Sequence, residues 1–438
     1  MTSKVARNAS WIIGCKLVQS ILGFVLNMLT ARFLGKSSFG DISYAMAVVS
    51  FVVPLMRLGF GNIMVQEIVQ HPEREGKAMG TGVFLNLVSA FACIAGVTAF
   101  AFVANPGETE TVIICALYGI KLIFEATDLM SYWYQAKLMA KYSSVISLIV
   151  HFVVLGYKIF LLVTLKSVYW FAVTSALEYL LCSVGMYTIY HFKKTQKLSI
   201  SLKLGKELID KGKHYILSSM MVMIFAETDK IMLKGLIDSS ATALYSTATI
   251  LAGATGFFFA AIIDSFRPWI FEVQKTNEEL FKERLKMLYS FIIYLSLLQS
   301  IVMTVFAKPI VLLTYGEQYA ESVGALQIVV WYTTFSYLGS VRNIWILAND
   351  KQKYLWVINL FGAGANVVLN VTLIPFLGIY GAAIASLVTQ IFTNVIVGYI
   401  LKPIRPNNAI MVSSLNPNCC IEAFRKLLKK EPKVKKDR

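Results

Sequence analysis

Apolar runs of about twenty residues, repeated along most of the chain, constrain its fold more than any other feature. A helix needs about 20 predominantly apolar residues to cross a bilayer. Twelve such runs can be identified, and polar segments such as GKSSFGD, QHPEREGK and NDKQK separate them. The sequence therefore predicts an all-α membrane protein with twelve transmembrane helices. We place them at residues 10–33, 41–62, 79–103, 111–135, 142–164, 168–190, 214–236, 241–268, 287–308, 322–347, 354–374 and 379–401.

Composition agrees with this class of protein. Of the 438 residues, 57% are hydrophobic and 15% are charged, whereas an average soluble domain is about 25% charged. The first apolar run is too long for the core of a signal peptide, and no small-residue cleavage site follows it. We therefore expect it to be a retained helix.

The distribution of Lys and Arg predicts the orientation. With both termini inside, the inner segments hold about 29 of these residues and the outer loops hold about five. We therefore expect a multi-pass membrane protein with cytoplasmic termini. The net charge of +16 lies along the predicted membrane borders, so we expect no nucleic-acid partner. The basic tail at 424–438 is expected to be solvated or to contact anionic lipids.

Internal similarity divides the chain into two halves. The stretch WYQAKLMAKYSSVISL (133–148) matches WILANDKQKYLWVINL (345–360) at seven of sixteen positions, and both join a predicted even-numbered helix to the next. A weaker match relates SVYWFAVTSALEY (167–179) to GIYGAAIASLVTQ (378–390). Both indicate a parallel repeat about a pseudo-two-fold axis along the membrane normal, which is typical of alternating-access transporters. The alternative is shared ancestry of the halves without present motion.

The predicted domains follow from the long polar segment after the sixth helix. They are an N-terminal six-helix bundle (1–191), a cytoplasmic Lys-rich linker (192–213), a C-terminal six-helix bundle (214–402) and a basic cytoplasmic tail (403–438).

Motifs for catalysis are missing. The chain has no G-x-x-x-x-G-K-[ST] phosphate loop, and its histidines and cysteines show no metal-ligand spacing. No predicted outer loop is long enough for the catalytic groups of a membrane polymerase or ligase. We expect a non-enzyme without a metal or cofactor.

Ionisable residues inside the predicted helices are the candidate functional residues. Each costs about 2.5–3.5 kcal/mol at a helix centre, so such residues usually face a cavity or a partner. They are Lys16, Arg57, Lys121, Glu125, Asp128, Lys158, Glu178, Glu227, Asp229, Lys230, Asp264, Arg267 and Arg342.

The sharpest group is KLIFEATD in the fourth predicted helix, where Lys121, Glu125 and Asp128 share one face. Either Lys121 and Glu125 only neutralise each other, or the group lines a cavity with Asp128 as a proton or ligand site. Arg57 either binds a phosphate with its planar fork or extends to the inner interface.

The remaining charges divide into local pairs and single residues. Asp264 and Arg267 are expected to form a local ion pair. Glu227 can pair with Lys230, which leaves Asp229 without a local partner. Glu178 has no charged neighbour in sequence, and it faces either a cavity or the bundle interior.

Three segments resemble the polysaccharide-export flippases, the Wzx-type transporters of O-antigen and capsule repeat units. They are TARFLGKSSFGDISYAMAVVSFVVPLMRLGFGNIMVQEI (30–68), TDKIMLKGL (228–236), and LANDKQKY followed by N-x-x-L-N and P-x-x-G-x-x-G-A-A-x-A. The resemblance implies that an undecaprenyl-pyrophosphate-linked oligosaccharide is moved from the inner to the outer leaflet of a bacterial inner membrane. Expected partners are this lipid, membrane lipids and other glycan-assembly proteins.

The resemblance also assigns roles to the membrane charges. Arg57, Lys121, Arg267 and Arg342 would bind the pyrophosphate and sugar in a cavity. Glu125, Asp128, Glu178 and Asp229 would be candidates to carry a proton or sodium ion, because the chain has no ATP site.

The closest alternative is a MATE-type cation-coupled drug exporter. Transporters of that type often carry an acidic residue in their first helix, but here this helix holds Lys16 and Arg32 without a carboxylate. Lipid II flippases generally have fourteen spans rather than twelve.

Overall fold

The computed structural model describes residues 2–193, 196–274 and 276–416, with side chains from residue 14 onward except those of Lys16, Asn62 and His214. The Lys16 side chain and the predicted basic tail at 424–438 therefore lie outside the described part. Every regular element within it is a helix, which confirms the predicted all-α class.

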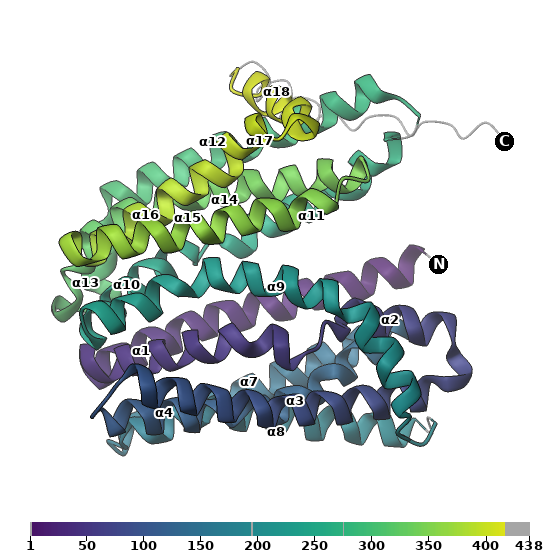
Figure 1. Ribbon diagram of the computed structural model, residues 1–438, viewed down its shortest axis with the longest axis horizontal. Coiled ribbons are helices and arrows are strands. Elements are labelled where there is room, and N and C mark those ends of the chain that lie inside the picture. Colours follow the sequence, from purple (N-terminus) through teal and green to yellow (C-terminus); the bar gives the residue numbers. More distant parts are fainter. Residues whose placement is uncertain (1, 194–195, 275, 417–438) are drawn as a thin grey trace.

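The first half of the chain forms a bundle of helices (Figure 1). Its elements are α1 (Thr2–Met56), α2 (Phe60–Gln70), η1 (Pro72–Arg74), α3 (Glu75–Ala104), α4 (Thr109–Gly119), α5 (Lys121–Glu125), η2 (Ala126–Leu129), α6 (Met130–Ala136), α7 (Ala140–Val163) and α8 (Val168–Phe192). We call this set the N-terminal bundle.

The second half begins with α9 (Leu202–Leu236), which lies between the N-terminal bundle and the helices that follow (Figure 1). We call the rest the C-terminal bundle. It comprises α10 (Ser239–Gly253), α11 (Gly256–Val273), α12 (Glu278–Val305), α13 (Ala307–Thr314), η3 (Glu317–Tyr319), α14 (Ser322–Ala348), α15 (Lys353–Leu377), α16 (Ile379–Ile391), the π-helical η4 (Phe392–Ile396), α17 (Val397–Ile400), η5 (Lys402–Ile404) and α18 (Arg405–Ser413).

The described residues contain eight helices that are long and apolar enough to cross a membrane, which supports a multi-pass membrane protein. One of them, Leu17–Met56, bends at Gly35 (φ 75°, ψ 175°), a conformation that glycine adopts without steric cost, and it covers two predicted runs. The runs at 111–135, 214–236 and 322–347 are helical but are not among the eight. The count of twelve stays a prediction.

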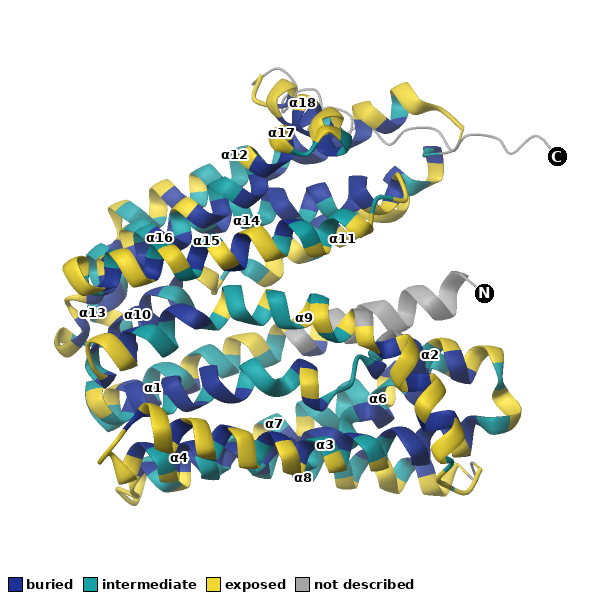
Figure 2. Ribbon diagram, in the orientation of Figure 1, coloured by how far each residue is buried: buried dark blue, intermediate teal, exposed yellow. Residues whose placement is uncertain are grey.

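Exposed apolar side chains on the outward faces agree with a lipid environment. Phe91, Phe160 and Phe361 are each at least half exposed, and Figure 2 shows buried residues along the faces where helices meet. Hydrocarbon offers no hydrogen-bond partner to backbone N–H and C=O groups. A segment that crosses it as an α-helix satisfies these groups within itself.

The predicted linker is partly helical. Residues 202–213 form the first part of α9, and Gln196 and Ser201 just before it bind Pro72 and Thr81 of the N-terminal bundle. The later part of α9 contacts α15. One helix is therefore anchored to both bundles.

Candidate functional site

A cluster of charged side chains lies inside the N-terminal bundle. Arg57 sits where α1 has ended and α2 has not begun, beside Leu58 (φ 48°) and Gly59 (φ 68°). Its Nε and Nη2 atoms donate to Glu125 Oε1 at 3.2 and 2.8 Å. Glu125 is only 3% exposed, whereas the Arg57 side chain is 36% exposed. The arginine therefore reaches a buried carboxylate and still presents a face to its surroundings.

Two more candidate residues complete this cluster. Lys121 Nζ lies 3.8 Å from Glu125 Oε2, so the predicted local pair is present. Asp128, which has no local partner in the sequence, lies 3.7 Å from Arg57 Nη2. We call Arg57, Lys121, Glu125 and Asp128 the charged cluster. It holds two cations and two carboxylates, so its formal charge is zero.

The fourth predicted helix is broken where the cluster forms. Residues Ala126–Leu129 adopt a 3-10 turn between α5 and α6, which winds more tightly than an α-helix and often marks a functional hinge. Asp128 lies on this turn and also lines an open cavity of about 280 Å³ between α1, α6 and α7. The break therefore places one carboxylate at both the cluster and the cavity.

Glu178 has a partner that sequence spacing did not reveal. His151 Nδ1 of α7 lies 3.1 Å from Glu178 Oε1 of α8. The two residues are 27 positions apart, so only the packing of α7 against α8 brings them together.

Asp229 of α9 is the most extensively hydrogen-bonded candidate residue. It is 3% exposed, and its Oδ1 accepts from Asn366 Nδ2 at 3.1 Å and from Asn370 Nδ2 at 2.5 Å. Its Oδ2 accepts from the hydroxyls of Tyr245 and Ser386. The segments TDKIMLKGL and N-x-x-L-N, noted separately in the sequence, thus meet here.

The Asp229 site adjoins a cavity of about 400 Å³ between α9 and the C-terminal bundle. Carboxylate and carbonyl oxygens are ligands that small hard cations prefer, and carboxylates inside membranes also occur in proton relays. The neighbouring Lys230 is bound to Glu227 at 2.8 Å, as the sequence predicted.

The other two candidate cations lie in the C-terminal bundle. Arg267 of α11 forms the expected ion pair with Asp264 at 3.1 Å. Arg342 of α14 is buried, and its Nη1 donates to the Thr393 carbonyl of the π-helical turn at 2.8 Å. Neither residue joins the charged cluster.

A polar network that the sequence did not predict joins the two bundles. Lys234 Nζ lies 2.5 Å from Glu108 Oε2 and 3.2 Å from Asp41 Oδ1, and the Ser239 hydroxyl donates to Asp41 Oδ1 at 2.6 Å. The hydrogen bond from Lys234 lowers the pKa of Glu108 below its ordinary value. In the sequence these charges lie at the ends of predicted helices, where they indicate only topology.

Further contacts reinforce the same end of the molecule. Lys36 binds Glu321 at 3.2 Å, and Arg32 Nη2 donates to the Leu313 carbonyl at 2.6 Å. We call this region, built from residues 27–41, 105–111, 234–239 and 312–321, the closed end. Figure 1 shows the bundles side by side here and diverging toward the end where the termini lie.

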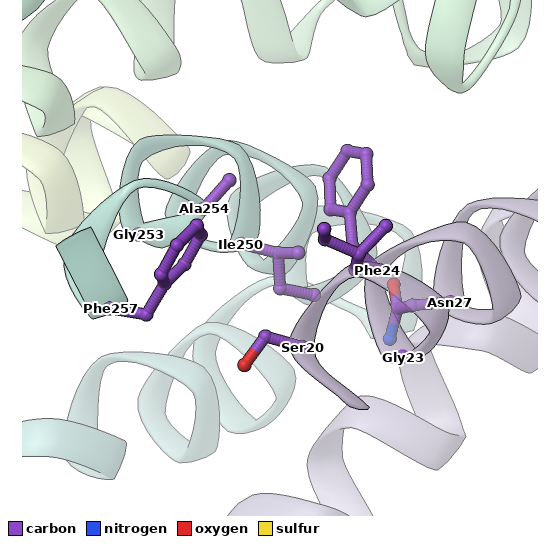
Figure 3. A pocket seen from close by; sticks show the side chains of 9 residues that line it. Ser20, Gly23, Phe24, Asn27, Ile250, Gly253, Ala254 and Phe257 are labelled. Atoms are coloured by element: carbon purple, nitrogen blue, oxygen red, sulfur yellow. The ribbon is translucent and has the colours of Figure 1, made fainter. Parts of the chain in front are cut away.

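The junction between the bundles also contains a largely apolar cavity of about 410 Å³. Ser20, Phe24 and Asn27 of α1 face Ile250 and Phe257 of the C-terminal bundle across it (Figure 3). Asn27 also accepts a hydrogen bond from Tyr315, so the cavity borders the closed end.

Several solved membrane-protein structures share this fold. The lipid II flippase MurJ, in an inward closed conformation, aligns with a TM-score of 0.72 at 12% identity over 97% of this chain and 93% of its own. A multidrug resistance MATE family transporter in its inward-facing conformation aligns with a TM-score of 0.66 at 13% identity, over 90% of this chain and 96% of its own. An outward-facing conformation of a multidrug resistance MATE family transporter aligns with a TM-score of 0.58 at 12% identity, over 94% of this chain and 96% of its own.

Sequence comparison identifies the family. No curated protein sequence matches the chain significantly. A family profile described as polysaccharide biosynthesis protein, however, matches residues 5–274. This match covers more than half of the 438 residues, and the chain therefore belongs to the polysaccharide biosynthesis protein family.

Proposed function

We propose that the chain is a flippase that moves an undecaprenyl-pyrophosphate-linked oligosaccharide, an O-antigen or capsule repeat unit, from the inner to the outer leaflet. Its family and its structural likeness to a lipid II flippase support a lipid-linked glycan as the cargo. A sugar and a pyrophosphate cannot cross hydrocarbon without compensation for their lost hydration. A transporter must therefore enclose the head group while the lipid tail stays in the bilayer.

The observation that carries this proposal is the charged cluster. Arg57 and Lys121 lie together inside the N-terminal bundle, and the guanidinium of Arg57 is partly accessible. An arginine fork binds two oxygens of a phosphate group with charge-assisted hydrogen bonds. Arriving pyrophosphate would compete with Glu125 and Asp128 for Arg57, and proton uptake by either carboxylate would favour the exchange. Anion binding and proton binding would thereby be coupled in one cluster.

Alternating access would proceed by rocking of two like bundles. We propose twelve spans in two six-helix bundles, 1–191 and 214–402, related by a pseudo-two-fold axis. Cytoplasmic termini in a bacterial inner membrane would make the closed end the outer face. The better alignment with the inward-facing than with the outward-facing MATE structure, 0.66 against 0.58, supports an inward-facing state.

Asp229 is our leading candidate for ion coupling, ahead of the paired Glu178. It joins α9 to α10, α15 and α16 through Tyr245, Asn366 and Ser386. A proton or sodium ion bound to this carboxylate would weaken those hydrogen bonds. Because α9 is also anchored to the N-terminal bundle, such a change would reach the junction between the bundles.

Complementation in the native host tests the proposal. We expect deletion of the gene to abolish surface polysaccharide and to trap lipid-linked repeat units inside. The intact gene should restore export, Arg57→Ala should not, and the exposed substitution Thr188→Leu on α8 serves as the control. Normal polysaccharide combined with new sensitivity to cationic drugs would instead identify a MATE-type exporter.

A further inference from the structure

The two repeated stretches fold into the same turn. In each, the helix closes through a residue in the left-handed region, Leu138 (φ 55°) in the first copy and Asp350 (φ 52°) in the second. The following amides bond back to equivalent carbonyls, Met139 to Tyr134 at 2.7 Å and Lys351 to Ile346 at 3.0 Å. The copies therefore share one backbone conformation, and they differ in the side chains that this backbone presents.

The shared and the divergent positions have separate roles. Trp133 and its counterpart Trp345 are both buried, at 3% and 4% exposure, and they hold the turn in the core. None of the seven shared positions lines the 280 Å³ cavity beside the charged cluster. All of the positions that line it from this stretch differ between the copies. They are Gln135, Ala140, Ser143, Ser144 and Ser147 in the first copy, and Leu347, Gln352, Leu355, Trp356 and Asn359 in the second.

At three of these five positions the first copy has a hydroxyl or amide group where the second has a bulky apolar side chain. Leu355 and Trp356 replace Ser143 and Ser144, so the serines leave space and add hydrogen-bonding groups. Across the cavity, Gln19 of α1 donates to the Ser147 hydroxyl at 3.0 Å. This lining can donate to and accept from several hydroxyls of one small ligand.

The size and position of the cavity specify the ligand further. A volume of about 280 Å³ lies just below the range of roughly 300–1,000 Å³ typical of small-molecule sites, which suits one sugar ring rather than a whole repeat unit. Asp128 belongs to both the cavity and the charged cluster. The first sugar of a pyrophosphate-linked glycan is bonded directly to phosphate, so its site must adjoin the phosphate site.

We infer that this cavity binds the first sugar of the lipid-linked unit through hydrogen bonds between its polar lining and the sugar hydroxyls. The inference rests on the proposed function, since it assumes that pyrophosphate binds at the charged cluster.

The test compares two probes on the full-length protein in lipid nanodiscs: undecaprenyl pyrophosphate alone and the same lipid bearing one N-acetylglucosamine. We expect the sugar-bearing lipid to bind about tenfold more tightly, which corresponds to about 1.4 kcal/mol. The double variant S143L/S144W, which carries the side chains of the second copy, should lose this preference and keep its affinity for the bare lipid. Thr188→Leu should keep both affinities.

The outcomes separate the inference from the function on which it rests. Equal affinity of the wild type for both lipids, or an intact preference in a folded S143L/S144W protein, overturns the sugar site and leaves the flippase proposal standing. Binding of neither lipid overturns the proposed function itself. If S143L/S144W does not fold, S143A/S144A decides, because loss of its preference supports the inference and an unchanged preference overturns it.

Discussion

Replacing Gly40 with alanine should weaken the contact between the bundles at the closed end. Gly40 lies on α1, and a Cβ built on it would be 1.8 Å from the backbone oxygen of Ser239 at the start of α10. Ordinary contact begins at 3.4 Å, so the helices would have to separate by about 1.6 Å, the difference between the two distances. Overpacking of this kind costs about 1–3 kcal/mol.

That separation also breaks the polar network at the closed end. The bond from the Ser239 hydroxyl to Asp41 is 2.6 Å long, and a further 1.6 Å would exceed hydrogen-bonding distance. A cost of about 1–3 kcal/mol changes the ratio of closed to open molecules by about 5- to 150-fold. We therefore expect Gly40→Ala to shift the population toward molecules that are open at this end.

Spin labels can measure the shift. In a protein without its native cysteines, labels at the exposed positions Lys166 and Glu317 would report the distance between the bundles by double electron–electron resonance. Gly40→Ala should move the distribution to longer distances. Gly96→Ala on α3 is the matched control, because nothing lies within 4 Å of a Cβ built there. A distribution in Gly40→Ala that coincides with the wild type would refute the reasoning.

Three further predictions concern the charges. Asp229→Asn places an amide donor among the hydroxyl and amide groups that donate to Asp229, and each buried donor left without an acceptor costs about 1–3 kcal/mol. We therefore expect gradient-driven transport to fall at least about tenfold. Transport that still follows the ion gradient would contradict this. Arg57→Ala leaves the buried Glu125 with a weaker partner and should lower stability by about 3 kcal/mol, at the low end of the range for a broken buried pair. Adding Glu125→Gln should restore the melting temperature but not transport, and recovery of both would reduce Arg57 to a structural role. Because Lys234 lowers the pKa of Glu108, the contact between them is intact above the ordinary carboxyl pKa of 4.5 and is lost as the pH falls through the lowered pKa. The distance between the spin labels should therefore lengthen when the wild type is acidified. In Glu108→Gln, which lacks the carboxylate at every pH, acidification should not lengthen it further.

Contacts within one helix could be predicted from the sequence. The pairs Glu227–Lys230 and Asp264–Arg267 are three residues apart, a spacing that places both side chains on one helical face. The apolar runs likewise predicted an all-helical membrane protein, because backbone bonding in hydrocarbon leaves few alternatives.

Contacts between helices could not be predicted in this way. Spacing does not say which helices are neighbours, so the partner of Glu178 and the contacts of Lys234 were missed. The donors to Asp229 had a partial signal, because Asn366 and Asn370 are two amides one turn apart in an apolar helix. The break in the fourth predicted helix had no signal in the sequence, since KLIFEATD contains neither glycine nor proline.

Transport by the purified protein tests the central claim most directly. Lipid-linked repeat units from the native host would be placed in the inner leaflet of proteoliposomes with the protein oriented as in the cell. Arrival of sugar at the outer face would be followed with an impermeant glycosidase. We predict that the protein accelerates this arrival, that an ion gradient increases the rate and that Arg57→Ala abolishes it. A rate equal to that of protein-free liposomes, with and without a gradient, would contradict the account.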